Sequence, residues 1–435
     1  MFKIAFRNVL RNGRRSLMTA LSIIVGACAL VLLGEYNNLV SVGMQTNLVR
    51  SLGHLGVFQK GYFEYGSGKP ATYSIADYDR KIALIRNDPE LKAMVTVVTP
   101  RITLGGIAGN AAVDKSKTFF STGFVPSEKN EMGKWDGYHI DLEPYDIGLK
   151  DSQPDHATVG IGLARILGLC EKNRLKGCPG VDENAKPLKP AQLQLLSGAG
   201  GAPNIVSVTV DRAINQGTKE ADDSYVGLTF KEAQQLLYGG SEHKAVSIAV
   251  QLVRTQDMAK AKARLTALFA AHHLDLEVRD FDEMFPMYRQ ILSYFMAMFA
   301  FIGVVMVIVV GFTIANTMSM SVMERTDEIG TGRAMGVRRS GIRRQFLLEG
   351  GLLGVLGATT GIVIALGVTY LINHSGITYT PPSAAQAERF YLLTKGNGPL
   401  LAGVWIMLVV ISTLASIVPA NRAAKMKVVD ALRHV

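Results

Sequence analysis

The stretch MERTDEIGTGRAMGVRRSGIRRQFLLEGG, residues 323–351, is dense in charge and lies between two long uncharged runs. No Asp, Glu, Lys or Arg occurs from Gln290 to Met323, and none occurs from Gly350 to Asn373. A helix that crosses a bilayer needs about 20 apolar residues to cover ~30 Å of hydrocarbon. The stretch, called here the charged segment, is therefore predicted to connect two membrane spans.

The same criterion finds four candidate spans along the whole chain. They cover residues 16–34, 290–320 (a span with a stalk), 350–373 and 400–420. A coupling loop or helix at 321–349 links the second span to the third, and a short loop at 374–399 links the third to the fourth. Residues 35–289 are too polar to span a membrane and long enough to bury cores of their own. The predicted fold class is an α-helical membrane protein with four transmembrane helices and a large α+β domain inserted between the first and second.

The large insertion mixes strand-like and helix-like runs. The run Met94–Ala108, with two later runs at 204–212 and 245–253, is rich in β-branched residues and alternates in part. Helical patterns begin near Ile75, Thr229 and Asp257. The Gly and Pro content of Cys178–Pro203 predicts an irregular loop or the boundary between two subdomains.

Basic residues beside the spans predict the orientation of the chain. Lys and Arg are in excess in residues 1–15, in the charged segment and in residues 421–435, and this excess accounts for the whole formal net charge of +10. These segments, and with them both termini, are predicted to be cytoplasmic. Residues 1–15 read as an amphipathic helix on the inner membrane surface, followed by a retained signal anchor. Charge spread over short juxtamembrane segments argues against nucleic-acid binding.

No catalytic constellation or metal site emerges from the sequence. The glycine-rich GYFEYGSGKP at 61–70 lacks the spacing of a phosphate-binding loop, because Ser67 intrudes and Pro70 follows Lys69. Cys170 and Cys178 lie in the predicted outer domain, where either a disulfide or two free thiols is possible. The chain is predicted not to be an enzyme by itself and to hold no cofactor.

The third predicted span carries two pairs of glycines at close-packing spacing. Helices approach closely where small residues repeat every fourth position, and the pairs here are Gly350 with Gly354 and Gly357 with Gly361. Glu349 heads this span, and an acid there must either extend to the inner interface or pair with a basic residue such as Arg343 or Arg344.

The charged segment resembles the signature of the MacB/FtsX-like ABC transporter permeases. The matching residues are ERTDEIGTGRAMG, then a basic stretch, then a Glu that opens the next span; VPANRAAKMKVVDALRHV at the C-terminus is similar to the family's closing pattern. Val428 and Val429 stand where the family usually has a Pro. Shorter stretches such as GITYTPPSA resemble the lipoprotein-releasing (LolC/LolE-like) branch.

The resemblance implies that the charged segment is a coupling element that docks on a cytoplasmic ATPase. The residues carried over to this role are Glu324, Arg325, Asp327, Glu328, Ile329, Arg333, Ala334 and Gly336. Ile329, Ala334 and Met335 are expected to supply an apolar face, and a solvated loop that merely turns the chain is the alternative.

The family further implies a mechanotransmitting permease of the bacterial inner membrane. Two copies of a separate ABC ATPase would bind ATP and Mg, and a second permease copy or a paralogue would complete the complex. The expected substrate is lipidated or amphipathic, with a periplasmic lipoprotein carrier or adaptor as a further partner and membrane lipids around the spans. The alternative is an FtsX-type signalling permease that activates an outer hydrolase or sensor without moving a substrate.

Overall fold

A computed structural model describes most of the chain. The described residues are 5, 7, 8, 11, 13–66, 68–140, 147–181, 190–198, 203–240, 242–380, 388–394 and 396–426. The chain divides into two units. The membrane unit comprises Met1–Ser41, Gln290–Ile377 and Arg389–Val435, and the α+β unit comprises Val42–Arg289 and Thr378–Glu388.

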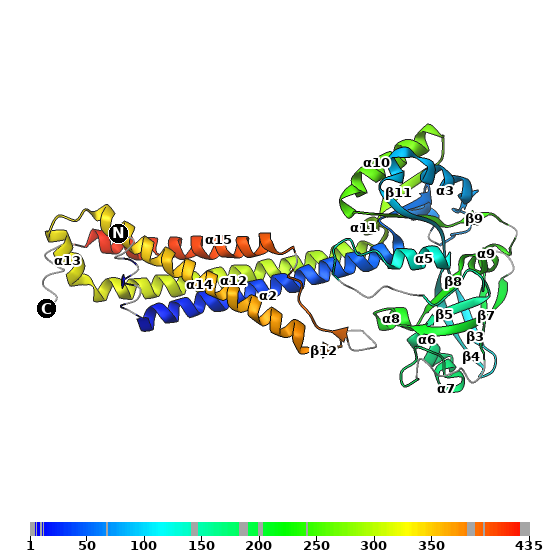
Figure 1. The fold of residues 1–435 in the computed structure, drawn as a ribbon, viewed down its shortest axis with the longest axis horizontal. Helices are drawn as coiled ribbons and strands as arrows, with labels where there is room; N and C mark the ends of the chain where they lie inside the picture. Colours follow the sequence, from blue (N-terminus) through cyan, green and yellow to red (C-terminus); the bar gives the residue numbers. More distant parts are fainter. Residues whose placement is uncertain are drawn as a thin grey trace. The chain divides into compact units, whose positions relative to one another are not determined.

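The membrane unit is built from helices. In chain order they are α2 (Gly13–Leu52), α12 (Pro286–Glu324), α13 (Thr326–Ala334), α14 (Arg339–Ser375), α15 (Gly398–Ala415) and α16 (Ile417–Lys425). Four spans within them are long and apolar enough to cross a membrane: Ser16–Leu52, Pro286–Glu324, Arg339–Ser375 and Gly398–Lys425. The helices that contain these spans lie side by side in the membrane unit (Figure 1). They share one buried cluster, which includes Ile23, Val310, Leu353 and Leu408. The chain is a multi-pass helical membrane protein.

Three of these helices are longer than the predicted spans. α2 contains 40 residues, or about 60 Å at 1.5 Å per residue, and it continues past residue 34 to Leu52. α12 is continuous from Pro286 to Glu324, and α14 begins at Arg339, well before Gly350. Most of the charged segment is therefore helical, and its middle forms α13 rather than an open loop.

The α+β unit contains one nine-stranded sheet in the order β11-β1-β10-β3-β4-β8-β5-β7-β6. Its strands are β1 (Leu55–Gln59), β3 (Val95–Asn110), β4 (Lys115–Phe124), β5 (His156–Gly160), β6 (Ala191–Ser197), β7 (Asn204–Ile214), β8 (Tyr225–Thr229), β10 (Ser247–Leu252) and β11 (Leu276–Asp280). β6 also pairs with β3, through Ile107 and Leu196. This pairing closes the strands from β3 to β6 into a barrel.

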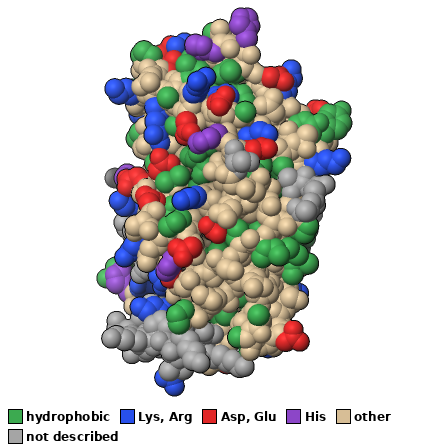
Figure 2. All heavy atoms as spheres, turned by 90° about the vertical axis from the view of Figure 1, so that its right-hand side faces the viewer, with side chains coloured by type: hydrophobic (Ala, Val, Ile, Leu, Met, Phe, Trp, Pro, Cys, Tyr) green, Lys and Arg blue, Asp and Glu red, His purple; other side chains and the backbone are tan. Residues whose placement is uncertain are grey.

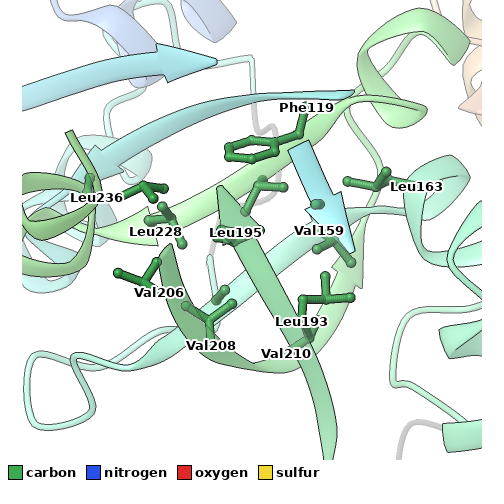
Figure 3. Packing of buried hydrophobic residues seen from close by; sticks show 14 of the residues in the cluster. Phe119, Val159, Leu163, Leu193, Leu195, Val206, Val208, Val210, Leu228 and Leu236 are labelled. Atoms are coloured by element: carbon green, nitrogen blue, oxygen red, sulfur yellow. The ribbon is translucent and has the colours of Figure 1, made fainter. Parts of the chain in front are cut away.

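The unit has two hydrophobic cores that share strand β3. The barrel core contains inward-facing residues such as Leu193, Leu195, Val208 and Leu228, and α9 (Phe230–Tyr238) adds Leu236 to it (Figure 3). The second core packs β1 and β10 against α3 (Tyr78–Asn87) and α10 (Met258–Ala271). With helices and strands both contributing, the predicted α+β class, inserted between the first and second membrane helices, is confirmed.

One segment differs from the sequence-based expectation. Part of Cys178–Pro203, predicted to be irregular, forms strand β6. Ala191, Leu193 and Leu195 are buried there and alternate with the exposed Gln192 and Gln194. This two-residue period is the usual pattern of a half-buried strand and outweighs the flanking glycines and prolines. Residues 182–189 and 199–202 lie outside the described part of the chain.

Candidate functional site

A buried ion pair lies at the centre of the charged segment. Arg325 occupies the one-residue break between α12 and α13, and its Nη1 donates to both carboxylate oxygens of Glu349 at 3.0 Å. The two side chains are only 8% and 4% exposed. The Arg325 guanidinium also lies over the ring of the buried Phe346, 5.4 Å from its centroid. The pair therefore joins α14 to the junction of α12 and α13.

The partner of Glu349 differs from the expected one. The sequence left two alternatives for Glu349, the inner interface or a basic residue such as Arg343 or Arg344; both arginines are exposed, and Glu349 is buried and pairs with Arg325. Residues on one helix share a face at spacings of three or four, whereas Arg343 and Arg344 precede Glu349 by six and five positions. Gln345, four residues before Glu349, does reach it, with Nε2 donating to Oε1 at 3.4 Å.

The N-terminal segment completes this polar network, which the sequence did not reveal. Asn8 Nδ2 donates to Glu349 Oε1 at 2.7 Å, and Arg11 forms an ion pair with Glu328. Glu328 also accepts from Arg325 Nε at 3.1 Å. Although desolvation would raise the pKa of the Glu328 carboxyl, the hydrogen bonds from Arg325 and Arg11 lower it below its usual value. Most of residues 1–12 lie outside the described part of the chain, so their predicted amphipathic helix stays a prediction.

Helix α13 has a buried face and an exposed face. Ile329 is buried in the same cluster as Ile342 of α14 and Ala423 of α16. Arg333 Nη1 donates to the Ala424 carbonyl at 3.2 Å. Of the three residues predicted to supply an apolar face, Ala334 and Met335 are exposed, whereas Ile329 is buried against the neighbouring helices.

The exposed face of α13 is acidic and apolar. The exposed residues of α13 and its immediate flanks include Glu324, Asp327, Glu328, Thr331, Ala334, Met335 and Gly336, and the basic Arg338 and Arg339 are exposed further along, at the start of α14. Met335 is 78% exposed, which is unusual for a large apolar side chain in an ordered helical segment. Asp327 and Glu328 lie in the first turn of α13, where acidic side chains interact favourably with the helix dipole.

The glycine pairs of α14 contact two different helices. A Cβ placed on Gly350 would lie 1.9 Å from Ser416 Oγ, and one on Gly354 would lie 2.7 Å from Ser412 Cβ, at the end of α15. A Cβ on Gly357 would lie 2.7 Å from Ile23 Cβ, and one on Gly361 would lie 2.6 Å from Ala27 Cβ, both on α2. The small residues therefore allow α14 to pack closely between α15 and α2.

The α+β unit carries the disulfide candidate. Cys170, in α7 (Leu169–Asn173), is bonded to Cys178, with the two Cα atoms 5.6 Å apart. Among the described residues no three His, Cys, Asp or Glu side chains are grouped as metal ligands. Acidic and basic side chains are interspersed on the face drawn in Figure 2.

Comparison with known proteins shows what the chain is similar to. Residues 300–428, which include the charged segment, match the family model described as FtsX-like permease C-terminal. Together with the relatives below, this match supports the similarity of the chain to the MacB/FtsX-like permeases.

Individual relatives are similar over different shares of the chain. The ABC transporter permease YtrF of Bacillus subtilis is 35% identical over 31% of both chains. An uncharacterized ABC transporter permease of Methanocaldococcus jannaschii is 22% identical over 99% of this chain and 96% of that protein. The macrolide export ATP-binding/permease protein MacB of Neisseria gonorrhoeae is 23% identical over 99% of this chain, which spans only 60% of its relative.

Among solved structures, the periplasmic region of MacB from Actinobacillus actinomycetemcomitans is similar at a TM-score of 0.31 and 12% identity, covering 55% of this chain and 95% of that one.

The closing pattern that resembles the family lies partly in residues 427–435, outside the described residues.

Proposed function

We propose that the chain is the permease subunit of an ABC transporter that works by mechanotransmission. In this proposal a separate cytoplasmic ATPase, in two copies, binds ATP and Mg and drives two permeases, which are either identical or paralogous. The membrane is the bacterial inner membrane, both termini are cytoplasmic, and the α+β unit is periplasmic. The excess of Lys and Arg in the segments that flank the spans supports this orientation.

The arrangement of α13 is the single observation that carries the proposal. The helix presents an acidic and apolar outer face, while Arg325, Ile329 and Arg333 fasten it to the rest of the membrane unit. In this proposal, these contacts pass a force applied to the outer face on to α12 and α14. The continuity of α2 and α12 over 40 and 39 residues supports transmission along these helices.

The interior of the membrane unit supports a substrate that does not cross it as a polar solute. Among the described residues of the four spans, the buried carboxylates are Glu35 and Glu349, and both accept hydrogen bonds, from Thr369 and Arg325 respectively. A path for a polar solute is usually lined by polar or ionisable groups that face water. We therefore propose that the complex extracts or exports a lipidated or amphipathic substrate, of which a lipoprotein is one example, from the periplasmic side, aided by a periplasmic carrier or adaptor.

A signalling permease of the FtsX type is the alternative. Such a complex would use the same α13 docking, but it would activate an outer hydrolase or sensor and move no substrate. The genes beside this one separate the two possibilities: a lipoprotein carrier or a periplasmic adaptor supports transport, and a cell-wall hydrolase or a histidine kinase supports signalling.

Docking through α13 is tested with Met335→Asp. We expect this variant to lower the stimulation of the partner ATPase at least tenfold, because a charge replaces an apolar contact at the proposed interface. A tenfold change corresponds to a loss of about 1.4 kcal/mol of binding free energy. The abundance and thermal stability of the permease should not change, because Met335 is exposed.

Ser340→Asp is the matched control. Ser340 is also exposed and lies in the charged segment, but in the first turn of α14, where an added acid is tolerated. Equal ATPase stimulation by wild type, Met335→Asp and Ser340→Asp would contradict docking through α13.

A further inference from the structure

Three cationic side chains lie together inside the α+β unit. Arg50 at the end of α2, Arg101 on β3 and Lys129 on α5 (Pro126–Gly133) line one cavity of about 460 Å³, and all three residues are buried. Asn47, Asn215, Gln216 and Tyr225 add polar groups to the cavity wall. Among the described residues that line the cavity there is no Asp or Glu. The cavity therefore carries positive charge, from Arg50 and Arg101 and, near neutral pH, in part from Lys129.

Arg101 is buried with two of its guanidinium nitrogens unsatisfied by the described residues. The residue is 8% exposed, and its Nε and Nη1 atoms make no hydrogen bond with the described part of the chain. A buried charged group without a partner is costly, and folded proteins rarely keep one. Burial lowers the pKa of Arg101 to about 10. Bringing an anion to this guanidinium would remove much of the cost.

Arg50 and Lys129 are held in place by backbone carbonyls. Arg50 Nε donates to the Trp135 carbonyl at 2.7 Å. Lys129 Nζ donates to the carbonyls of Arg50 and Ser51, at 2.9 and 3.3 Å. Burial, with repulsion from Arg101 as a second cause, lowers the pKa of Lys129 to about 7. Asp136 interacts electrostatically with Arg50. The fold thus fixes these cations around the cavity rather than leaving them on flexible surface side chains.

A second cavity, of about 560 Å³, adjoins the first. The two share Leu52, Arg101, Thr103 and Phe120 in their walls. The rest of the second wall is largely apolar and aromatic, and includes Phe58, Tyr62, Phe63, Leu104, Leu237 and Met284. The described residues of its wall include no acidic side chain either. Arg101 and Phe120 therefore lie where a cationic cavity meets an apolar one.

We propose that the α+β unit binds an anionic amphiphile across these two cavities. A phosphate or carboxylate head contacts Arg50, Arg101 and Lys129, and its hydrocarbon chain lies against Phe120 and the aromatic residues beyond. Charge-assisted hydrogen bonds to a fixed guanidinium are among the stronger polar contacts, and cavities of this size are typical of ligand sites. That this ligand is the transported substrate rests on the proposed function, whereas the binding itself does not.

The test measures binding to the full-length chain in a neutral detergent by native mass spectrometry. The probes are lysophosphatidylglycerol, diacyl phosphatidylglycerol, lysophosphatidylcholine and inorganic phosphate. We expect lysophosphatidylglycerol to bind saturably and more tightly than lysophosphatidylcholine or phosphate. Arg101→Gln should weaken its binding about ten- to a hundredfold, which corresponds to one hydrogen bond to a charged group. Arg80→Gln, which changes an exposed arginine of the same unit, should leave binding unchanged.

Two further variants distinguish the contribution of the ligand's head group from that of its hydrocarbon chain. Phe120→Ser should weaken binding of lysophosphatidylglycerol and leave that of phosphate unchanged, whereas Lys129→Gln should weaken both, and it also serves as a second test if Arg101→Gln fails to fold. Tight binding of the diacyl lipid would indicate that the natural ligand is a membrane phospholipid. Preference for the single-chain probe would indicate that it is an extracted amphiphile.

The proposal is overturned if wild type binds no probe saturably, if phosphatidylcholine and phosphatidylglycerol head groups bind equally, or if Arg101→Gln and Lys129→Gln bind as wild type does. Because the assay uses neither ATP nor the partner, these outcomes are independent of the Met335→Asp experiment. Weakened binding in Arg101→Gln with unchanged transport would support the site and exclude it as the substrate site.

Discussion

We expect Glu349→Gln to lower the free energy of unfolding of the membrane unit by about 3 kcal/mol. Removing one partner of a buried ion pair leaves an uncompensated charge, which typically costs about 3–5 kcal/mol. The lower end of that range applies here, because Glu328 still accepts a hydrogen bond from Arg325 Nε. The glutamine retains the shape of the side chain, so the loss measures charge rather than packing.

Cys28 offers a direct measurement of this effect. It is the free cysteine of the described chain and lies, partly buried, in α2 of the membrane unit. A thiol-reactive fluorophore should therefore label the variant at a lower denaturant concentration than it labels wild type. Arg325→Leu combined with Glu349→Leu should recover most of the loss, because a buried ion pair can often be replaced by apolar residues.

Glu131→Gln is the matched control for Glu349→Gln. Glu131 is paired with Lys134, but both side chains are more than half exposed. Exposed ion pairs contribute little to stability, so this change should be nearly neutral. If Glu349→Gln and Glu131→Gln unfold at the same denaturant concentration, the buried pair does not hold α14 to the junction of α12 and α13.

Alanine substitutions at two glycines of α14 should change stability in opposite directions. A Cβ on Gly361 would lie 2.6 Å from Ala27 Cβ and 2.7 Å from the Ile24 carbonyl oxygen, so Gly361→Ala must separate α14 from α2. Overpacking of this kind costs about 1–3 kcal/mol. Gly367, in the same helix, has no atom within 4 Å of its added Cβ, so Gly367→Ala should gain about 0.5–1 kcal/mol of helix propensity.

The two alanine variants are compared by heating detergent extracts and measuring the fraction that remains monodisperse in size-exclusion chromatography. We expect Gly361→Ala to melt below wild type and Gly367→Ala at or above it. A melting temperature for Gly361→Ala equal to that of Gly367→Ala would show that the glycine is not needed for the approach of α14 to α2.

Local patterns in the sequence predicted the elements of the fold. The uncharged runs on both sides of the charged segment predicted the second and third spans, because only a membrane allows so many consecutive apolar residues. Runs of β-branched residues predicted β3, β7 and β10. The four-residue spacing of the α14 glycines predicted close packing, but not which helix each pair would contact.

Contacts between distant residues were not predictable in the same way. Arg325 and Glu349 meet because a one-residue break between α12 and α13 turns the chain back, and no local period reveals that break. Arg101 stands in an alternating stretch with Thr99 and Thr103, a pattern typical of a solvent-facing side of a strand. Arg101 is nevertheless buried, in the wall of a cavity that Arg50 and Lys129, both remote in sequence, also line.

The central claim, that α13 docks on a cytoplasmic ATPase, is tested most directly by site-specific photocrosslinking. A photoreactive amino acid at Met335, on the exposed side of the charged segment, should capture a chain that mass spectrometry identifies as an ATPase by its phosphate-binding loop. The same probe at Tyr370, 63% exposed toward the other end of α14, should not capture that chain. Capture of the ATPase at Tyr370 and not at Met335 would contradict the proposed coupling and the orientation on which it depends.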